Sequence, residues 1–372
     1  MNILLVNWLD LDNPKAGGAE VHLFEVFGRL AARGHRVRLL CSGWEGCRRE
    51  TTVRGIQVRR VGSRTGFALQ ARSAFRRWVA EEAPEVVVEN INKMPLFLSG
   101  RTRAPFLVLV NHLFGEVSFD EAGPLVGGVL WLLERPIPWA YRRAEFEAVS
   151  DSTRADLIAR GVPAERIRVV LSGVDTTTLH PDPALSRATP PRFLYLGRLK
   201  RYKGVETAIR ALALARGSRP DMALDVAGGG DDRDRLERVA AELGLGDAVR
   251  FHGPVSEAEK LRLMQTATAN LLPSRKEGWG MTNVEAAACG TPSIAADSPG
   301  LRDSVRQGET GFLVPLGDPA AWAERMLLLA NDPALVTRLG RAARRFAETL
   351  NWEHAADLTE QHLVSMLPSR QR

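Results

Sequence analysis

Short apolar segments, glycine-containing loops and amphipathic helices alternate along this chain, and the alternation starts twice. The first start is the apolar run at residues 2–7, followed by a loop with Gly17 and Gly18, a predicted helix and an apolar run at 36–41. The second start is the predicted strand at 192–196, again followed by a glycine-containing loop and a helix. This order is typical of doubly wound α/β domains with a parallel sheet. The sequence therefore predicts two such domains.

Composition agrees with a globular protein of this kind. A length of 372 residues suffices for two domains with separate cores, and 45% hydrophobic with 25% charged residues is usual for soluble proteins. No apolar run reaches the roughly 18 residues that a membrane span needs. The first residues read as a strand and not as a signal peptide. Three cysteines without a Cys-x-x-Cys pair favour neither disulfides nor structural zinc, and they predict a cytoplasmic protein.

The formal net charge of +6 suits phosphorylated substrates, anionic lipids or nucleic acid. Because no zinc finger and no aromatic RNA-binding motif accompanies the charge, we do not expect nucleic acid as a partner. The segment 115–143 is rich in Trp and Arg. We expect helices that cover the sheet there, and the alternative is peripheral contact with a lipid surface or an apolar acceptor.

Further elements follow from the hydrophobic pattern. In the first half we expect strands at 53–61, 86–89, 106–110, 146–150 and 166–171, and helices at 71–82 and after residue 151. In the second half we expect strands at 223–227, 270–273 and 292–296, and helices after residues 205 and 231. Asp231 and Asp232 are expected to cap the latter helix.

Two carboxylates, Glu277 and Glu285, are separated by seven residues and enclose a Gly-Trp-Gly turn. Thr282 is expected to cap a helix at 283–289. Free backbone N–H groups and the positive end of the helix dipole then form a seat for an anion, while the carboxylates can accept protons from sugar hydroxyls. In the alternative interpretation, Thr282 and Glu285 form only a capping box and Glu277 is a solvated loop residue.

A second motif is the basic loop at 197–204, which has glycine at both ends and contains Arg198 and Lys203. A strand, a basic glycine-flanked loop and a helix N-terminus together predict a diphosphate site. The alternative is a solvated basic loop without a ligand.

These motifs resemble the signature of the retaining glycosyltransferases of glycosyltransferase family 4, in which Glu-x7-Glu precedes Ala-Ala-x-x-Gly-Thr-Pro. The loop at 197–204 matches that family's Gly-Arg-Leu-x-x-x-Lys-Gly motif. The resemblance implies the GT-B fold, with two Rossmann-like domains that face a central cleft. It assigns the acceptor to the first domain and a nucleoside-diphosphate sugar to the second.

The resemblance also implies roles for single residues. Glu277 faces the donor sugar, Glu285 binds the ribose, and Arg198 and Lys203 neutralise the leaving diphosphate, so that no essential metal or other cofactor is expected. Contacts to the sugar and the diphosphate come from the backbone of the turn, namely Gly278, Trp279, Gly280, Met281 and Thr282. The stretch that ends at Val255 is expected to contact the nucleobase edge through its backbone.

In the first half, Gly17 and Gly18 resemble the family's Gly-Gly-x-Glu loop, although a plain turn is the alternative. His112 resembles the histidine that reaches the donor sugar, and a structural histidine is the alternative. For the acceptor we single out polar residues that follow two predicted strands: Asn90, Asn92, Lys93 and Asn111. Ser172 stands where the family usually has Asn, which removes one possible contact. The pair Asp10 and Asp12 is interpreted as part of a solvated loop.

The predicted domains are residues 1–175 and 192–351, joined by a linker at 176–191. By resemblance, a terminal helix at 352–372 returns to the first domain. The predicted activity is metal-independent transfer of a hexosyl group to an acceptor hydroxyl with retention at the anomeric carbon. A phosphorylase or epimerase of the same architecture, or a subunit that only binds nucleotide sugars, stays open. The sequence names neither the base, nor the sugar, nor the acceptor.

Overall fold

The computed structural model describes residues 1–92, 94–115 and 117–368, so that Lys93 lies outside the described residues. The chain divides into two compact units. The first contains Met1–Phe119, Pro124–Gly173 and the C-terminal segment from Asn351. The second contains Val174–Leu350 together with Asp120–Gly123.

The first unit is built on one sheet. Its strands are β1 Asn2–Val6, β2 Arg36–Gly43, β3 Glu50–Val53, β4 Ile56–Ser63, β5 Val86–Ile91, β6 Phe106–Val110, β7 Glu145–Ala148 and β8 Ile167–Val169. Their order is β3-β4-β2-β1-β5-β6-β7-β8, and every pairing is parallel except that of β3 with β4. The stretch predicted as one hairpin-type strand at 53–61 therefore contains the end of β3, the turn at 54–55 and most of β4.

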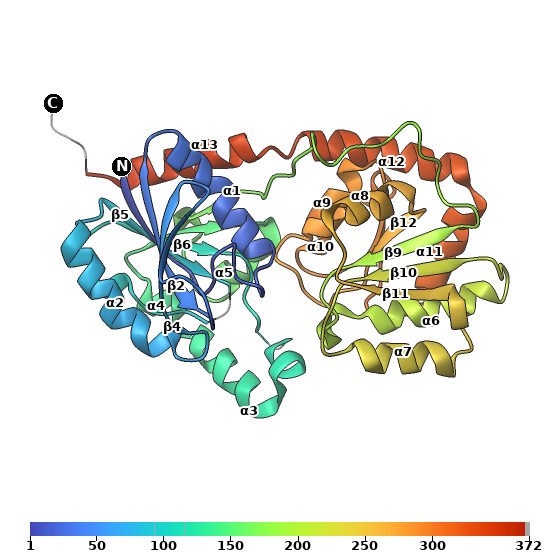
Figure 1. The fold of residues 1–372 in the computed structure, drawn as a ribbon, viewed down its shortest axis with the longest axis horizontal. Coiled ribbons are helices and arrows are strands. Elements are labelled where there is room, and N and C mark those ends of the chain that lie inside the picture. Colours follow the sequence, from blue (N-terminus) through green and yellow to red (C-terminus); the bar gives the residue numbers. More distant parts are fainter. Residues whose placement is uncertain (93, 116, 369–372) are drawn as a thin grey trace. The chain divides into compact units, whose positions relative to one another are not determined.

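Helices cover both faces of this sheet. They are α1 Gly18–Ala32, α2 Phe67–Glu82, α3 Val117–Glu134, α4 Ile137–Ala140, α5 Asp151–Ala159 and α13 Trp352–Met366. Strand residues alternate between the faces, so that Leu4 and Val6 join the cluster of α2, whereas Ile3 and Leu5 point to the other side. Figure 1 shows α1 and α2 on opposite faces, as right-handed crossovers in opposite directions require.

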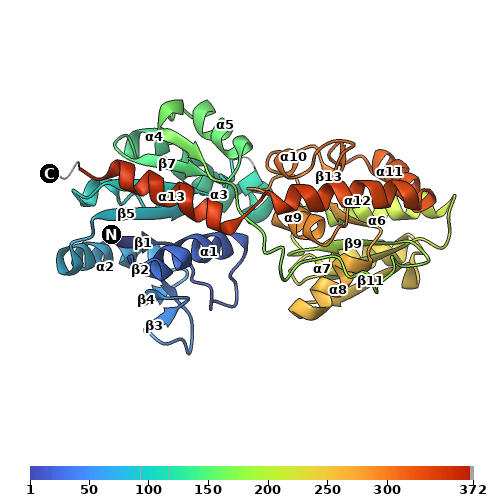
Figure 2. The same ribbon diagram turned by 90° about the horizontal axis from the view of Figure 1, so that it is seen from above.

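The C-terminal helix α13 packs beside α1 in the first unit (Figures 1 and 2). The Glu147 carboxylate of β7 anchors it: His362 Nδ1 lies 2.8 Å from one oxygen, and the Thr359 hydroxyl donates to the other at 3.0 Å. All three side chains are buried. Removing one member would leave buried polar groups unpaired, which makes this contact specific as well as stabilising.

The second unit contains an entirely parallel sheet. Its strands are β9 Arg192–Leu196, β10 Ala223–Ala227, β11 Val249–Gly253, β12 Ala269–Leu272, β13 Ser293–Ala296 and β14 Gly311–Val314. Their order is β11-β10-β9-β12-β13-β14. The helices are α6 Val205–Arg216, α7 Arg233–Glu242, α8 Glu257–Thr266, α9 Met281–Ala288, α10 Leu301–Ser304, α11 Pro319–Asn331 and α12 Pro333–Glu348. The predicted strand and helix positions agree with these within a few residues.

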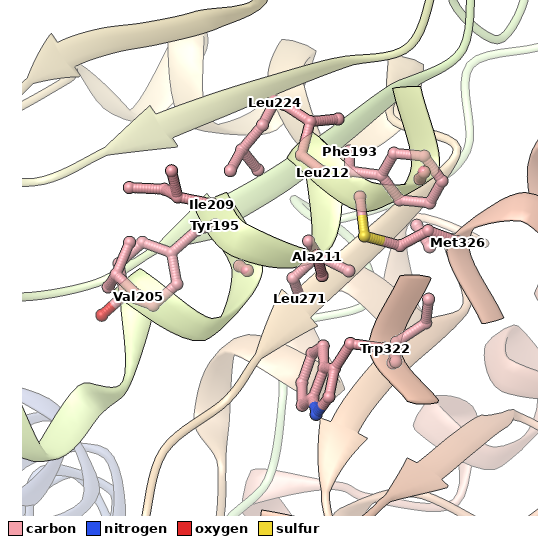
Figure 3. Packing of buried hydrophobic residues seen from close by; sticks show 14 of the residues in the cluster. Phe193, Tyr195, Val205, Ile209, Ala211, Leu212, Leu224, Leu271, Trp322 and Met326 are labelled. Atoms are coloured by element: carbon pink, nitrogen blue, oxygen red, sulfur yellow. The ribbon is translucent and has the colours of Figure 1, made fainter. Parts of the chain in front are cut away.

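The core of the second unit lies between this sheet and its helices. Figure 3 shows Trp322 and Met326 of α11 beside Ala211 of α6, with Phe193 and Leu271 contributed by strands. Each of these side chains is completely buried. Because α6 has small residues at 208, 211 and 215, it can pack closely on α11.

The segment predicted as a linker, 176–191, belongs to the second unit. Two arginines hold it through backbone oxygens. Arg187 donates to the carbonyls of Ala267 and Gly290, and Arg344 donates to those of Thr176 and Leu179. Burial lowers the pKa of Arg187 to about 10.

The glycines of the loop after β10 allow this loop to pack directly against the backbone of the loop after β9. A Cβ at Gly228 would lie 1.9 Å from the Gly197 oxygen, and one at Gly230 would lie 2.0 Å from the Leu199 oxygen. The predicted capping by aspartates is wrong. Although Asp232 occupies the N-cap position of α7, its carboxylate accepts from Arg235 and no backbone N–H, while Asp231 pairs with Lys200.

The prediction of a solvated loop at Asp10 is also wrong. Asp10 is completely buried, and both of its oxygens accept from Arg60, at 2.7 and 2.9 Å. Asp12 accepts from the same guanidinium at 2.9 Å. Asp10 and Asp12 therefore form ion pairs with Arg60, which connect the loop after β1 to β4.

In the segment 115–143, the first helix, α3, consists of two pieces, and α4 follows it. The backbone of α3 breaks at Gly123, whose φ of 74° lies in the left-handed region, and Pro124 starts the next piece. Leu125, Val129 and Leu132 follow at helical spacing and are exposed by 88%, 55% and 58%. In the part of the chain that the structure describes, no helix is long and apolar enough to cross a membrane.

Candidate functional site

The two predicted motifs of the second unit meet at one place in its sheet. Strand β9 leads into the basic loop, and β12 leads into the Gly-Trp-Gly turn. These strands are neighbours, and the strand order reverses between them. In open α/β sheets, ligands bind outside the carboxyl ends of the strands at such a switch point. The topology thus brings together two motifs that are about seventy residues apart in the chain.

An ion pair joins the two motifs. The Lys203 Nζ lies 2.5 Å from the Glu277 Oε1, and the two side chains are exposed by only 12% and 17%. Burial by itself lowers the pKa of Lys203, but the Glu277 carboxylate raises it, and the balance lies above the ordinary value. Lys203 is therefore a fixed positive charge at neutral pH, and Glu277 is not the solvated residue of the alternative interpretation.

Backbone contacts fix the position of this carboxylate. The Arg275 N–H donates to the Tyr202 oxygen at 2.9 Å, and the Glu277 N–H donates to the Pro299 oxygen at 3.1 Å. Gly300 makes the second contact possible, because a Cβ there would lie 2.2 Å from the Glu277 oxygen. The sequence analysis did not select Gly300, and its only signal is its place in a Ser-Pro-Gly turn.

The helix after the turn begins earlier than predicted. It starts at Met281 with Gly280 as N-cap, so that Thr282 lies in the first turn and does not cap the helix. Gly280 has a φ of +83°, and a Cβ there would lie 2.6 Å from the Ser304 hydroxyl. Only glycine fits this entry. The first N–H groups of the helix, which have no partner inside it, follow directly on the turn.

The second carboxylate is not part of a capping box either. Glu285 Oε1 lies 2.7 Å from Lys260 Nζ of α8, and the side chains are exposed by 18% and 17%. Burial raises the pKa of Glu285, and Lys260 offsets this effect in part. Lys260 was missed by the sequence analysis, because a lysine inside an ordinary amphipathic helix carries no motif.

The remaining predicted residues of this unit lie around the pair. Arg198 is exposed and forms no ion pair with any residue that the structure describes, while its carbonyl accepts from the buried Tyr195 hydroxyl. Trp279 is 4% exposed, and its indole N–H has no hydrogen-bond partner among those residues. Val255 follows β11 and is half-buried.

In the first unit, the glycine loop after β1 is closed by a buried carboxylate. Gly17 is the N-cap of α1, and its N–H donates to Glu20 at 2.8 Å. The other Glu20 oxygen accepts from the amides of Asn92, at 2.7 Å, and Asn7, at 3.2 Å. This network holds the exposed Gly18 at the carboxyl end of the first strand.

Asn90, near the end of β5, and Asn111, directly after β6, lie at the same edge of the sheet, because these strands pair in parallel. Asn90 is buried, and neither its Oδ1 nor its Nδ2 has a partner in the described chain; the same holds for Asn111 Oδ1. By contrast, the Nδ2 of Asn92 donates a hydrogen bond to Glu20. His112 is half-buried with its ring 4.7 Å from that of Phe114. An unpaired buried amide and a second unpaired amide oxygen at one sheet edge suit a polar ligand.

Two further buried carboxylates shape these loops and were not found from the sequence. Glu89 accepts from the N–H groups of Leu96 and Leu98, at 2.7 and 3.1 Å. Glu134 accepts from Phe114 and Gly115, at 2.6 and 2.9 Å. Burial raises the pKa of Glu89. Both residues fix loop backbone next to candidate side chains.

Ser172, the departure from the family pattern, has a structural partner. Its hydroxyl lies 2.8 Å from Nδ1 of the buried His22. Burial lowers the pKa of His22 to about 4, so that the imidazole is neutral at neutral pH. Gly173 passes close to the start of α13, where a Cβ would lie 2.5 Å from the Trp352 nitrogen.

Comparison with known proteins decides the family. The profile of Glycosyltransferase Family 4 matches residues 16–178, and that of Glycosyl transferases group 1 matches residues 177–346. The chain is 35% identical to D-inositol 3-phosphate glycosyltransferase of Streptomyces avermitilis, over 96% of its own length and 85% of the relative's. The chain belongs to glycosyltransferase family 4. This family 4 glycosyltransferase is an enzyme of the hexosyltransferase class, and the resemblance seen in the sequence is confirmed.

The matches to other known proteins extend over almost the whole length of this chain. Glycogen synthase of Mycobacterium tuberculosis is 29% identical over 97% of this chain and 94% of the relative. Sucrose-phosphate synthase from Thermosynechococcus elongatus has a TM-score of 0.84 at 25% identity, covering 98% of both chains. Anabaena HepE in complex with UDP-glucose has a TM-score of 0.78 at 20% identity, covering 98% of this chain and 99% of its own. The predicted GT-B fold is confirmed.

Proposed function

We propose that this enzyme transfers a hexosyl group from a nucleoside-diphosphate sugar to an acceptor hydroxyl, with retention at the anomeric carbon. The carrying observation is the Lys203–Glu277 pair at the switch point, 2.5 Å apart and mostly buried. It sets a fixed cation beside a fixed carboxylate at a sheet edge where ligands bind. The printed names of the relatives, which include a glycogen synthase and the UDP-glucose complex of HepE, support a sugar-nucleotide donor.

In this proposal each group has a separate task. Lys203, Arg198 and the N-terminus of α9 stabilise the diphosphate as it leaves with negative charge. Glu277 orients the sugar, and the departing phosphate takes the proton of the acceptor hydroxyl. Glu285 accepts hydrogen bonds from the ribose: Lys260 holds its Oε1, and in the part of the chain described here its other oxygen has no partner.

The diphosphate assignment can be tested by binding alone. We expect that Arg198→Gln and Lys203→Gln each weaken the binding of a nucleoside diphosphate by about 1.5–3 kcal/mol, because each removes a charge-assisted contact. Isothermal titration calorimetry with UDP, GDP and ADP measures this loss and also identifies the base. Arg338→Gln, an exposed arginine on α12 of the same unit, is the control and should bind like the wild type. Unchanged affinity in both site variants would reject the site.

We further propose that no metal is essential, since protein cations carry the neutralisation. Turnover should then survive excess EDTA, measured as release of the nucleoside diphosphate from the true donor. Activity that EDTA abolishes and magnesium or manganese restores would contradict this assignment. Among the residues that the structure describes, no group of three or more His, Cys, Asp or Glu side chains is placed to hold a metal ion.

The acceptor is assigned to the first unit. The unpaired amide of Asn90 and the unpaired Oδ1 of Asn111 support polar contacts there, and we retain the proposed role of His112 toward the donor sugar. Peripheral membrane contact stays a prediction, supported by the exposed apolar side chains of α3 and by Trp139, which is 71% exposed. The cytoplasmic location also stays a prediction.

A further inference from the structure

An arginine-lined groove occupies the edge of the first sheet opposite to Gly17, Asn90 and Asn111. It consists of two adjoining cavities that share the segment 100–104 as a wall, with volumes of about 980 and 870 Å³. The first lies between the end of α2 and this segment, and the second extends toward the starts of β7 and β8. In a parallel sheet these are the amino ends of the strands, so the groove is separate from the predicted site residues of this unit.

Among the described residues, six arginines line the groove, and Arg103 lines both cavities. The six are Arg76, Arg101, Arg103, Arg142, Arg143 and Arg168. Among the residues that the structure describes, one carboxylate lines the groove, that of Glu145. The acidic residues at the end of α2 are engaged elsewhere, because Glu81 pairs with Arg59 and Glu82 with Arg38. The groove therefore carries an unbalanced positive charge.

The arginines themselves lack anionic partners. Within the described residues, Arg76, Arg101, Arg103 and Arg143 form no ion pair, and Arg142 only lies over the Trp139 ring at 5.6 Å. The Nε of Arg101 is buried and has no hydrogen-bond partner there. Burial lowers the pKa of Arg101, and the charges of Arg76 and Arg72 lower it further. Arg33 of the same unit, by contrast, pairs with Glu353 and Glu360.

Unpaired like charges that share a cavity raise one another's energy, and a bound anion would remove this cost. Guanidinium groups are suited to phosphate oxygens, which they bind through two parallel hydrogen bonds. The two volumes fall in the range of small-ligand pockets. We propose that this groove binds a small molecule with two or more phosphate groups. The site is independent of the proposed donor site.

Inorganic tripolyphosphate is a suitable probe, because it carries the phosphate chemistry without a base or sugar. Calorimetry with tripolyphosphate should show two sites, one that Lys203→Gln weakens and a second that this substitution leaves unchanged. Arg76→Gln/Arg103→Gln should weaken the second site at least about tenfold, since two charge-assisted contacts are lost. Arg338→Gln/Arg341→Gln removes the same charge from α12 and should leave it unchanged. Both pairs are surface residues, and turnover should equal that of the wild type.

Equal tripolyphosphate affinity in the wild type and the groove variant would overturn the proposal. Vesicles of phosphatidylglycerol and phosphatidylcholine separate a lipid headgroup from a free phosphate. We expect the wild type and the groove variant to sediment equally with them. Vesicle binding that depends on Arg76 and Arg103, without binding of tripolyphosphate, would instead make the groove a lipid-contact surface. Failure of the nucleoside diphosphate to bind would reject the donor site alone.

Discussion

Replacing Glu277 with glutamine should lower turnover by about 100-fold or more, while the affinity for a nucleoside diphosphate changes by less than about threefold. The carboxylate is proposed to contact the sugar, where charge develops as the anomeric bond breaks. Glutamine keeps the size of the side chain but cannot supply the negative charge. Because Lys203 stays in place, the diphosphate contact should survive. Steady-state kinetics with the true donor, together with calorimetry of the bare diphosphate, measures both effects.

The matched comparison is Glu285→Gln. A ribose contact is made equally in the ground state and the transition state, so its loss should raise the KM for the donor and leave kcat nearly unchanged. Glu309→Gln is the control, because among the described residues this exposed carboxylate forms an ion pair only with Arg306, at 3.3 Å. Equal and small effects at Glu277 and Glu285 would mean that both ion pairs are structural. A large loss of diphosphate affinity in Glu277→Gln would assign this carboxylate to the positioning of Lys203.

Gly228→Ala should lower the free energy of unfolding by at least about 3 kcal/mol. Two costs add at this position. A Cβ would lie 1.9 Å from the Gly197 oxygen, and the φ of +129° is one that other residues rarely adopt. The loop after β10 would have to move away from the basic loop after β9, whose Leu199 N–H donates to the Gly229 oxygen at 2.9 Å. Urea denaturation measures the loss, and donor affinity should fall as well.

Gly308→Ala separates the cost of the steric clash from the cost of the backbone conformation. Gly308 also has a positive φ, +73°, but an added Cβ would meet no heavy atom of the described residues within 4 Å. Its substitution should therefore cost only the backbone strain, about 1–2 kcal/mol. If the two variants lose the same stability, the close approach of the loops contributes nothing and backbone conformation explains both.

The comparison of sequence and structure shows where local pattern is sufficient. The strands β9 and β10 agree with the runs predicted at 192–196 and 223–227, because buried parallel strands are short, apolar and bounded by loops. The two motifs that we assign to the donor could also be selected from the sequence, since a glycine at both ends of a basic loop has a local conformational reason. Arg198, Lys203, Glu277 and Glu285 all came from such patterns.

Errors arose where a local rule competed with a distant partner. Thr282 has the right side chain for a helix cap, yet Gly280 takes that position because the Ser304 hydroxyl lies too close for any Cβ. Asp10 is predicted to be solvated, yet it is buried because it forms an ion pair with Arg60, fifty residues away in the chain. In both places the deciding contact comes from another strand or helix, which sequence spacing does not reveal.

The sequence by itself determined the two α/β units, the family and the residue types available for chemistry, because these follow from hydrophobic periodicity and from motifs within single loops. The tertiary structure alone decided which charges meet. It paired Lys203 with Glu277 and Glu285 with Lys260, and it left the arginines at the amino edge of the first sheet without partners. The reason is physical: an ion pair depends on distance and burial, and parallel strands bring together residues that the chain separates.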